Sequence, residues 1–270
     1  AIFKAYDVRG TVPDQLDPEL AHAIGVGFAT FAREESEGRG ESVTRVLMAR
    51  DMRPSGVELS AAFADGVRSQ GLDVVDLGLG STDLLYFASG SMGAPGVMFT
   101  ASHNPAQYNG AKFCLSGARP VGEDTGLGRI REVGEASLAG SVPAAATTGT
   151  ISSLDVLGAF ADHVRSFVDV SSLAPLRIVA DTANGMGGLI VPAVFSSLPF
   201  DLEIMYGELD GTFPNHPADP IQPANTEDLR RRVVEAGADV GLAFDGDADR
   251  VFLVDEKGVG LSGSTTTAII

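Results

Sequence analysis

Short apolar segments alternate with amphipathic segments along most of this chain. We expect strands at Val46–Ala49, Val74–Leu77, Val97–Thr100, Ala111–Leu115, Arg177–Ala180, Leu202–Tyr206, Val240–Phe244 and Val251–Val254. The amphipathic segments predict helices at Leu20–Arg33, Gly56–Gln70, Asp83–Ser89, Gly126–Ser137, Leu154–Val168 and Thr226–Ala236. This alternation is typical of α/β proteins. We therefore predict two consecutive three-layer α/β domains with mixed, largely parallel sheets.

The length of 270 residues favours two domains over one. Between Leu138 and Ser153 the chain is rich in Ala, Gly, Ser, Thr and Pro without periodicity, which predicts a linker or boundary. We expect one domain over residues 1–145 and a second over residues 146–260. Residues 261–270 have the pattern of a starting helix, so we expect that a third domain begins there and that more protein follows Ile270.

The net charge of −17 argues against nucleic acid as a partner, because no basic stripe is present to neutralise phosphates. No apolar run approaches the roughly 20 residues that a membrane-spanning helix needs, and no N-terminal signal pattern is present. The single cysteine, Cys114, excludes an intrachain disulfide or a cysteine-rich zinc site. These features predict a cytoplasmic location without membrane partners.

Three carboxylates follow the predicted strand Val240–Phe244, in the run Asp245-Gly246-Asp247-Ala248-Asp249-Arg250. At alternating positions, separated only by small residues, they are able to converge on one cation. Oxygen ligands suit a hard ion, Mg²⁺ above all, with Mn²⁺ and Ca²⁺ as alternatives. An EF-hand is rejected, because its sixth loop position needs Gly and here holds Arg250, and because a strand follows directly.

A serine loop, Thr100-Ala101-Ser102-His103-Asn104-Pro105, follows another predicted strand. We expect Ser102 to be exposed on a tight turn. A serine hydrolase is the enzymatic alternative, but the sequence lacks a Gly-x-Ser-x-Gly elbow, and His103 is adjacent to Ser102 and not placed as its base. Ser102 as carrier of a phosphoryl group beside a magnesium loop is the better interpretation.

These two loops, together with Phe3–Gly10 at the start, resemble the α-D-phosphohexomutase family, in its phosphomannomutase/phosphoglucomutase branch. The supporting stretches are Arg50–Ser55, Tyr108–Lys112, Asp181–Gly185 and Pro214–His216. The resemblance covers the whole chain. We interpret Arg50, Asp51 and Arg53 as residues that brace the first domain and do not touch substrate.

The resemblance implies an intramolecular phosphotransferase that interconverts hexose 1-phosphate and hexose 6-phosphate, of mannose or glucose, through a hexose 1,6-bisphosphate. It implies these roles: Ser102 as phosphoryl carrier and metal ligand, Asp245, Asp247 and Asp249 as Mg²⁺ ligands, Lys112 as general acid/base or charge stabiliser, Arg9 and Arg250 on phosphate oxygens, and His103 in support of the Ser102 loop at the phosphate site.

Members of the family usually have four domains, and the sugar-recognising and phosphate-gripping loops of the third and fourth are absent from this sequence. We therefore expect the chain to bind Mg²⁺ and to carry phosphoserine, but to turn over hexose phosphates weakly or not at all. Two alternatives remain open: a metal-dependent phosphatase with an aspartate nucleophile, and a catalytically silent module that binds sugar bisphosphates.

Overall fold

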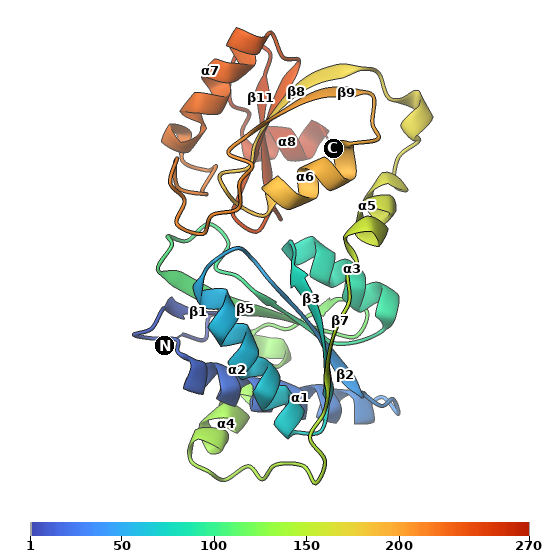
Figure 1. The fold of residues 1–270 in the computed structure, drawn as a ribbon, viewed down its shortest axis with the longest axis vertical. Helices are drawn as coiled ribbons and strands as arrows, with labels where there is room; N and C mark the ends of the chain where they lie inside the picture. Colours follow the sequence, from blue (N-terminus) through green and yellow to red (C-terminus); the bar gives the residue numbers. More distant parts are fainter. Residues whose placement is uncertain (1, 270) are drawn as a thin grey trace. The chain divides into compact units, whose positions relative to one another are not determined.

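The computed structural model describes residues 2–269, and the chain divides into two compact units (Figure 1). The first unit contains the chain up to Leu79, Asp83–Ala101 and Gln107–Val156. The second contains Gly80–Thr82, Ser102–Ala106 and the chain from Leu157 onward. Two short loops of the N-terminal half therefore belong with the C-terminal unit.

The first unit is built on a mixed sheet in the order β1-β5-β4-β2-β3-β7, with β6 paired to β5. Its strands are β1 (Val8–Thr11), β2 (Arg45–Arg50), β3 (Asp73–Leu79), β4 (Gly96–Phe99), β5 (Tyr108–Leu115), β6 (Arg119–Pro120) and β7 (Ile151–Ser153). The pairs among β4, β2, β3 and β7 are parallel, whereas β5 runs antiparallel to β1, β4 and β6.

Helices cover both faces of this sheet. They are α1 (Pro18–Glu37), α2 (Ser55–Ser69), α3 (Thr82–Met92) and α4 (Leu127–Leu138), with a 3₁₀ turn η1 at Glu123–Thr125. Buried side chains of α1, α2 and α4 form one core with the strands, in which the rings of Phe28 and Phe113 lie 4.9 Å apart between centroids. On the other face, a β-carbon on Gly96 would lie 3.0 Å from Leu85 of α3 and 3.4 Å from Cys114.

The second unit has a four-stranded sheet in the order β11-β10-β8-β9, parallel except for the antiparallel pair β10–β11. Its elements are α5 (Leu157–Arg165), η2 (Val170–Ser172), β8 (Leu176–Asp181), α6 (Gly187–Phe195), β9 (Phe200–Met205), η3 (Pro223–Thr226), α7 (Glu227–Ala236), β10 (Val240–Phe244), β11 (Val251–Asp255) and α8 (Gly263–Ile269). Helix α7 packs its apolar side on β8, β10 and β11, and Figure 1 shows α6 on the opposite side of the sheet.

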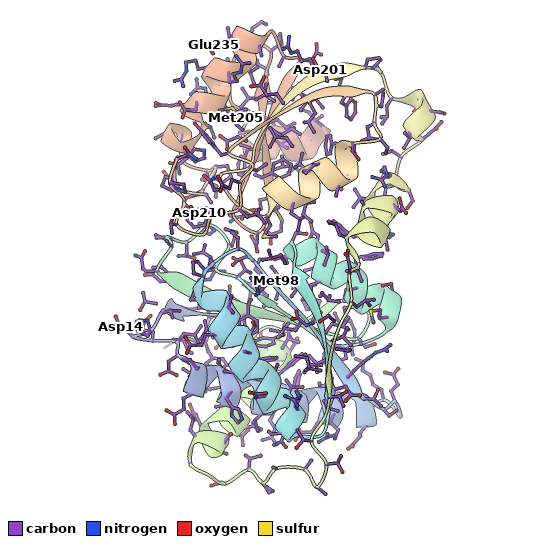
Figure 2. All side chains as sticks on the ribbon, in the orientation of Figure 1. Asp14, Met98, Asp201, Met205, Asp210 and Glu235 are labelled. Carbon is purple, nitrogen blue, oxygen red and sulfur yellow. The ribbon has the colours of Figure 1, made fainter. Side chains whose placement is uncertain are left out.

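Most charged side chains lie on the surface of each unit, and apolar side chains form its core. Asp14, Asp201 and Glu235 are exposed, whereas Met98 lies inside the first unit (Figure 2). Among residues 2–269, no helix combines the length and the apolar character needed to cross a bilayer.

The predicted fold class is confirmed, and the structure corrects it in detail. The interpretation of Leu138–Ser153 as a linker is wrong for its last part, because β7 (Ile151–Ser153) pairs in parallel with β3. Backbone hydrogen bonds from Ala145 to Ser69 and from Gly149 to Arg68 hold the preceding residues as well. The strand was not predicted because its three residues are all exposed at the edge of the sheet and show no apolar periodicity. The helix predicted at Leu154–Val168 is shorter, at Leu157–Arg165.

We predict that Gly66→Ala destabilises the first unit by about 1–3 kcal/mol. A β-carbon at Gly66 in α2 would lie 2.1 Å from the backbone oxygen of His22 in α1, so the two helices would have to separate. Urea unfolding followed by circular dichroism measures the effect. The control is Gly128→Ala in α4, where a β-carbon meets no atom within 4 Å; it should stabilise by about 0.4–1 kcal/mol. Equal effects from both variants would contradict the packing described.

Candidate functional site

The acidic loop is the connection of a β-hairpin in the second unit. Register pairs Phe244 of β10 with Val251 of β11, so that Asp245–Arg250 form the turn between them. The loop is closed by the Asp245 amide, which donates to the Arg250 carbonyl at 3.2 Å, and by the Ala248 amide, which donates to the Asp245 carbonyl at 3.1 Å. Asp245 and Asp247 are fully buried. Such burial of two carboxylates excludes a plain solvated turn.

The serine loop joins β4 to β5, and its residues Ser102–Ala106 belong to the second unit. Ser102 has a left-handed backbone with φ of 50°, uncommon outside glycine. The prediction that Ser102 is exposed is wrong: only 4% of its surface is accessible. The reason is that its hydroxyl is turned towards the acidic loop and donates to Asp245 Oδ2 at 2.7 Å.

Arg250 ties these groups together. Its Nη2 donates to Ser102 Oγ at 2.7 Å and to Asp245 Oδ2 at 2.5 Å, while its Nε donates to the same carboxylate oxygen at 2.9 Å. The same Nη2 lies 2.5 Å from Nδ1 of His103. Because a guanidinium only donates, Nδ1 of His103 accepts and the ring proton lies on Nε2. A cation and a hydroxyl therefore converge on one buried carboxylate, and the imidazole of His103 contacts the cation.

Two further residues of this unit support the loop, and the sequence analysis missed both. Thr82, at the start of α3, donates from Oγ1 to Asp247 Oδ2 at 2.6 Å. Its position after β3, where a helix begins, was the available signal. Gly246 is required for a different reason, since a β-carbon there would lie 2.4 Å from the Ser102 carbonyl oxygen. Only glycine allows the two loops this close.

The turn after β8 also contacts the acidic loop. Ala183 and Asn184 both have positive φ, and a β-carbon on Gly185 would lie 2.7 Å from the Gly246 carbonyl oxygen. The amide of Met186 donates to that same carbonyl at 2.9 Å. The turn between β8 and α6 therefore packs directly against the acidic loop.

The electrostatics of the carboxylate cluster favour a cation. One carboxylate oxygen from each of Asp245, Asp247 and Asp249 lies within 4.8 Å of the others. Burial, together with the charges of Asp247 and Asp249, raises the pKa of Asp245 to about 7, although Arg250 and the Ser102 hydrogen bond oppose this. An all-oxygen donor set of this charge fits a hard divalent ion.

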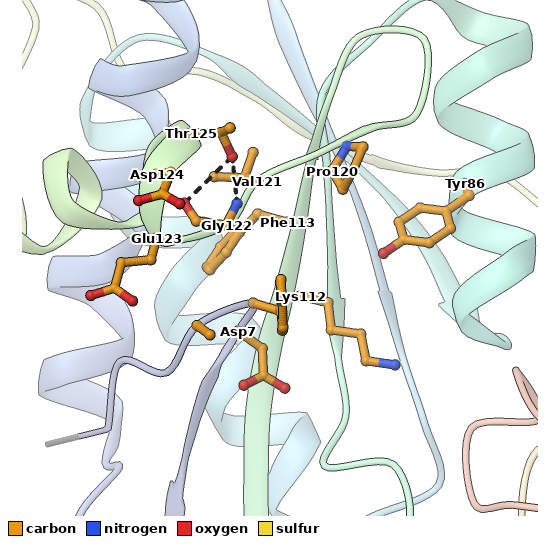
Figure 3. Close-up of a pocket in the computed structure, with 12 residues that line it drawn as sticks. Asp7, Tyr86, Lys112, Phe113, Pro120, Val121, Gly122, Glu123, Asp124 and Thr125 are labelled. Carbon is orange, nitrogen blue, oxygen red and sulfur yellow. Dashed lines mark hydrogen bonds between the residues drawn. The ribbon is translucent and has the colours of Figure 1, made fainter.

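Arg9 and Lys112 lie in the first unit, on adjacent strands. Arg9 of β1 pairs in register with Gly110 of β5 and forms an ion pair with Asp7. Lys112, two residues further along β5, lies opposite Met98 of β4 and lines a cavity of about 450 Å³. Figure 3 shows its amine near the Tyr86 side of this cavity, with Glu123, Asp124 and Thr125 across from it. The structure thus groups six of the eight predicted site residues in the second unit, and Arg9 and Lys112 in the first.

Comparison with known proteins assigns both units. Residues 1–135 match the family profile described as phosphoglucomutase/phosphomannomutase, alpha/beta/alpha domain I, and residues 158–258 match that of alpha/beta/alpha domain II. The chain belongs to the phosphoglucomutase/phosphomannomutase family.

Relatives in this phosphoglucomutase/phosphomannomutase family support the assignment. The chain is 40% identical to a protein of Xanthomonas campestris named phosphohexose mutases and 36% identical to the phosphomannomutase of Salmonella montevideo, in each case over 97% of the chain and 56% of the relative. A crystal structure of a family protein from Burkholderia thailandensis matches with a TM-score of 0.81 and 33% identity, over 96% of this chain and 55% of that one. The chain therefore spans about half the length of the curated relatives it matches.

His216, from the Pro214–His216 stretch, is held by a buried carboxylate of this family member's second unit. Its Nε2 lies 3.0 Å from Asp181 Oδ2 and its Nδ1 lies 3.0 Å from the Pro217 carbonyl oxygen. Both ring nitrogens face acceptors, which suits the doubly protonated ring. Burial by itself lowers the pKa of His216, but the hydrogen bond and charge of Asp181 outweigh it, so that the net pKa is raised.

We predict a pH-dependent contribution of His216 to stability. A histidine whose pKa is higher in the folded state than in the unfolded state stabilises the fold. This contribution is complete at pH values below the unfolded-state pKa of about 6.5, and it is lost as the pH rises through the folded-state pKa. The difference in unfolding free energy between wild type and His216→Gln should therefore be larger at pH 6 than at pH 8.5. Urea unfolding at both values measures it. Asp181→Asn should also reduce the pH dependence of the unfolding free energy. If the difference between wild type and His216→Gln instead grew with pH, the raised pKa of His216 would be contradicted.

Proposed function

We propose that this chain supplies the phosphoryl-transfer centre of a hexose-phosphate mutase. The enzyme would interconvert hexose 1-phosphate and hexose 6-phosphate, of mannose or glucose, through a phosphoserine at Ser102 and a hexose 1,6-bisphosphate. The observation that carries the proposal is the hydroxyl of Ser102, held at 2.7 Å both from a carboxylate of an acidic cluster and from a guanidinium. Family membership supports the same reaction class.

Ser102 suits the role of phosphoryl carrier because a cationic side chain contacts its hydroxyl oxygen, where negative charge would develop during transfer. During transfer to a sugar hydroxyl, the bond between phosphorus and Ser102 Oγ breaks and the electron pair stays on Oγ. The Nη2 donor of Arg250 already points at that oxygen and would stabilise the developing charge. His103 accepts from the same Nη2 and so fixes the guanidinium in this orientation. A cationic clamp of this kind commonly contributes on the order of 10³-fold in rate.

The acidic cluster would hold Mg²⁺ through Asp245, Asp247 and Asp249, with an oxygen of phosphoserine completing the ligand set. When bound, the ion would neutralise charge on the phosphoryl oxygens. Thr82 would fix the Asp247 carboxylate by its 2.6 Å hydrogen bond. Three oxygen donors with no nitrogen or sulfur ligand favour Mg²⁺ over zinc or copper.

Lys112 and Arg9 would act on the substrate side. The amine of Lys112 lines the cavity of the first unit and would take the proton of the attacking hydroxyl or stabilise the transferring phosphoryl group. Arg9, on the neighbouring strand, would bind phosphate oxygens. The hexose phosphates and the hexose 1,6-bisphosphate are the proposed partners, and the names of the relatives, phosphomannomutase and phosphohexose mutases, fit the hexose phosphates.

We predict that the chain, incubated with glucose 1,6-bisphosphate and Mg²⁺, takes up one phosphoryl group on Ser102. Intact mass with peptide mapping detects the added group, and Ser102→Ala should abolish it. Ser91→Ala, a serine of α3, is the matched control and should take up phosphoryl like the wild type. Removal of Mg²⁺ by a chelator should slow uptake at least about tenfold, by analogy with loss of one charge-neutralising element.

The same experiment separates the alternatives. Phosphorus on an aspartate of the acidic loop, which hydroxylamine releases, would replace this proposal by a phosphatase-type mechanism. Equilibrium binding of the bisphosphate without any covalent uptake, in the presence of Mg²⁺, would instead favour a silent sugar-bisphosphate-binding module.

A further inference from the structure

Two charged residues directly after β2 are buried in the first unit. Asp51 and Arg53 are both fully inaccessible to solvent. The Nε of Arg53 donates to Asp51 Oδ2 at 3.1 Å, and the backbone amide of Arg53 donates to Asp51 Oδ1 at 3.0 Å. The pair therefore closes a three-residue turn, Asp51–Arg53, in the interior. It is far more enclosed than surface ion pairs of this chain such as Arg129 with Glu34.

This turn contacts both ends of the serine loop. The amide of Asp51 donates at 2.9 Å to the carbonyl of Phe99, the last residue of β4. The Nη1 of Arg53 donates at 3.0 Å to the carbonyl of Tyr108, the first residue of β5. Residues 100–107, with Ser102 among them, lie between these two anchored carbonyls. One buried pair thus holds where the loop leaves the sheet and where it returns.

Sheet pairing alone does not supply this anchoring. Phe99 pairs in register with Ala111, and Tyr108 pairs with Thr11 of β1, so no strand pairing joins Phe99 to Tyr108. Backbone hydrogen bonds hold each end separately, from the Thr100 amide to the Gly110 carbonyl at 3.1 Å and from the Val12 amide to the Gln107 carbonyl at 2.9 Å. The bridge through Asp51 and Arg53 is what joins the two ends to each other. Asn109 reinforces the returning end, since its side chain donates to Ser55 Oγ at 2.9 Å and accepts from the Gly110 amide at 2.8 Å.

Stability is a poor explanation for burying such a pair. Taking two charges out of water costs several kcal/mol per ion, and an apolar replacement of similar volume is often neutral or stabilising. The guanidinium, however, presents several donors in a fixed planar fork, which allows one side chain to reach Asp51 and the Tyr108 carbonyl together. A lysine offers a single point charge and would not hold both acceptors in this geometry.

We propose that Asp51 and Arg53 are positioning residues for phosphoryl transfer, which act through Ser102 by fixing the two ends of its loop. The inference rests on the proposed role of Ser102 and deepens it. The contacts described for the pair reach the carbonyls of Phe99 and Tyr108 at the ends of the loop. Their effect is on the position of the nucleophile, where an error of about 1 Å commonly costs on the order of 100-fold in rate.

The test compares the 270-residue wild type with Arg53→Lys and Asp51→Asn in two measurements, well below the unfolding temperature. The first is the rate of phosphoryl uptake by Ser102 from glucose 1,6-bisphosphate with Mg²⁺. The second is amide hydrogen exchange of residues 100–107 relative to the rest of the first unit. Arg129→Lys, which weakens an exposed ion pair to Glu34, is the matched control.

The proposal predicts uptake at least about tenfold slower in Arg53→Lys, together with faster exchange confined to residues 100–107, while Arg129→Lys matches the wild type. Mg²⁺ affinity, measured by titration calorimetry, should stay within twofold in Arg53→Lys, because the three aspartates are unchanged. Wild-type exchange and uptake in folded Arg53→Lys and Asp51→Asn would overturn it. If the wild type itself takes up no phosphoryl group, the proposed function fails, and hydrogen exchange still decides the role of the pair.

Discussion

The hydrogen bond between Ser102 and Asp245 is the contact on which the rest of the site depends. It requires two hairpin loops to approach until the carbonyl of Ser102 occupies the space that a β-carbon of residue 246 would fill. It also places Ser102 in a left-handed conformation, which costs roughly 1–3 kcal/mol for a residue other than glycine. The neighbouring contacts must therefore offset both strain and burial.

Electrostatic contacts around Asp245 offset the strain and the burial of Ser102. Asp245 is buried beside two other carboxylates, an arrangement that by itself favours protonation or a bound cation. Arg250 neutralises part of this charge while it also binds Ser102, so the guanidinium stabilises the resting loop and, on our proposal, would bind a phosphorylated one as well. On our proposal, Mg²⁺ supplies the remaining positive charge. The strain at Ser102 and the crowding of carboxylates are then two parts of one arrangement.

The sequence predicted what depends on local pattern and failed where long-range packing decides. The α/β architecture follows from apolar segments that alternate with amphipathic ones, and α1 (Pro18–Glu37) contains the helix predicted at Leu20–Arg33. Burial of Ser102 could not be predicted, because it depends on a loop 143 residues away in the sequence. Thr82 and Gly246 were missed for the same reason.

The strand β7 was missed because a three-residue edge strand carries no periodicity. Conversely, the interpretation of Asp51 and Arg53 as bracing residues came from their place beside a motif, and the structure now gives the atoms that they hold. The groups proposed to touch substrate, Arg9 and Lys112, were selected through family resemblance and remain predictions.

The central claim is that the serine loop and the acidic loop form one phosphoryl-transfer centre. The most direct test replaces Mg²⁺ by paramagnetic Mn²⁺ in chain phosphorylated on Ser102 and records the phosphorus resonance. The account predicts that stoichiometric Mn²⁺ broadens the phosphoserine signal severely, and that Asp247→Asn weakens the effect. A phosphoserine signal that stays sharp while Mn²⁺ is bound to the acidic loop would contradict it.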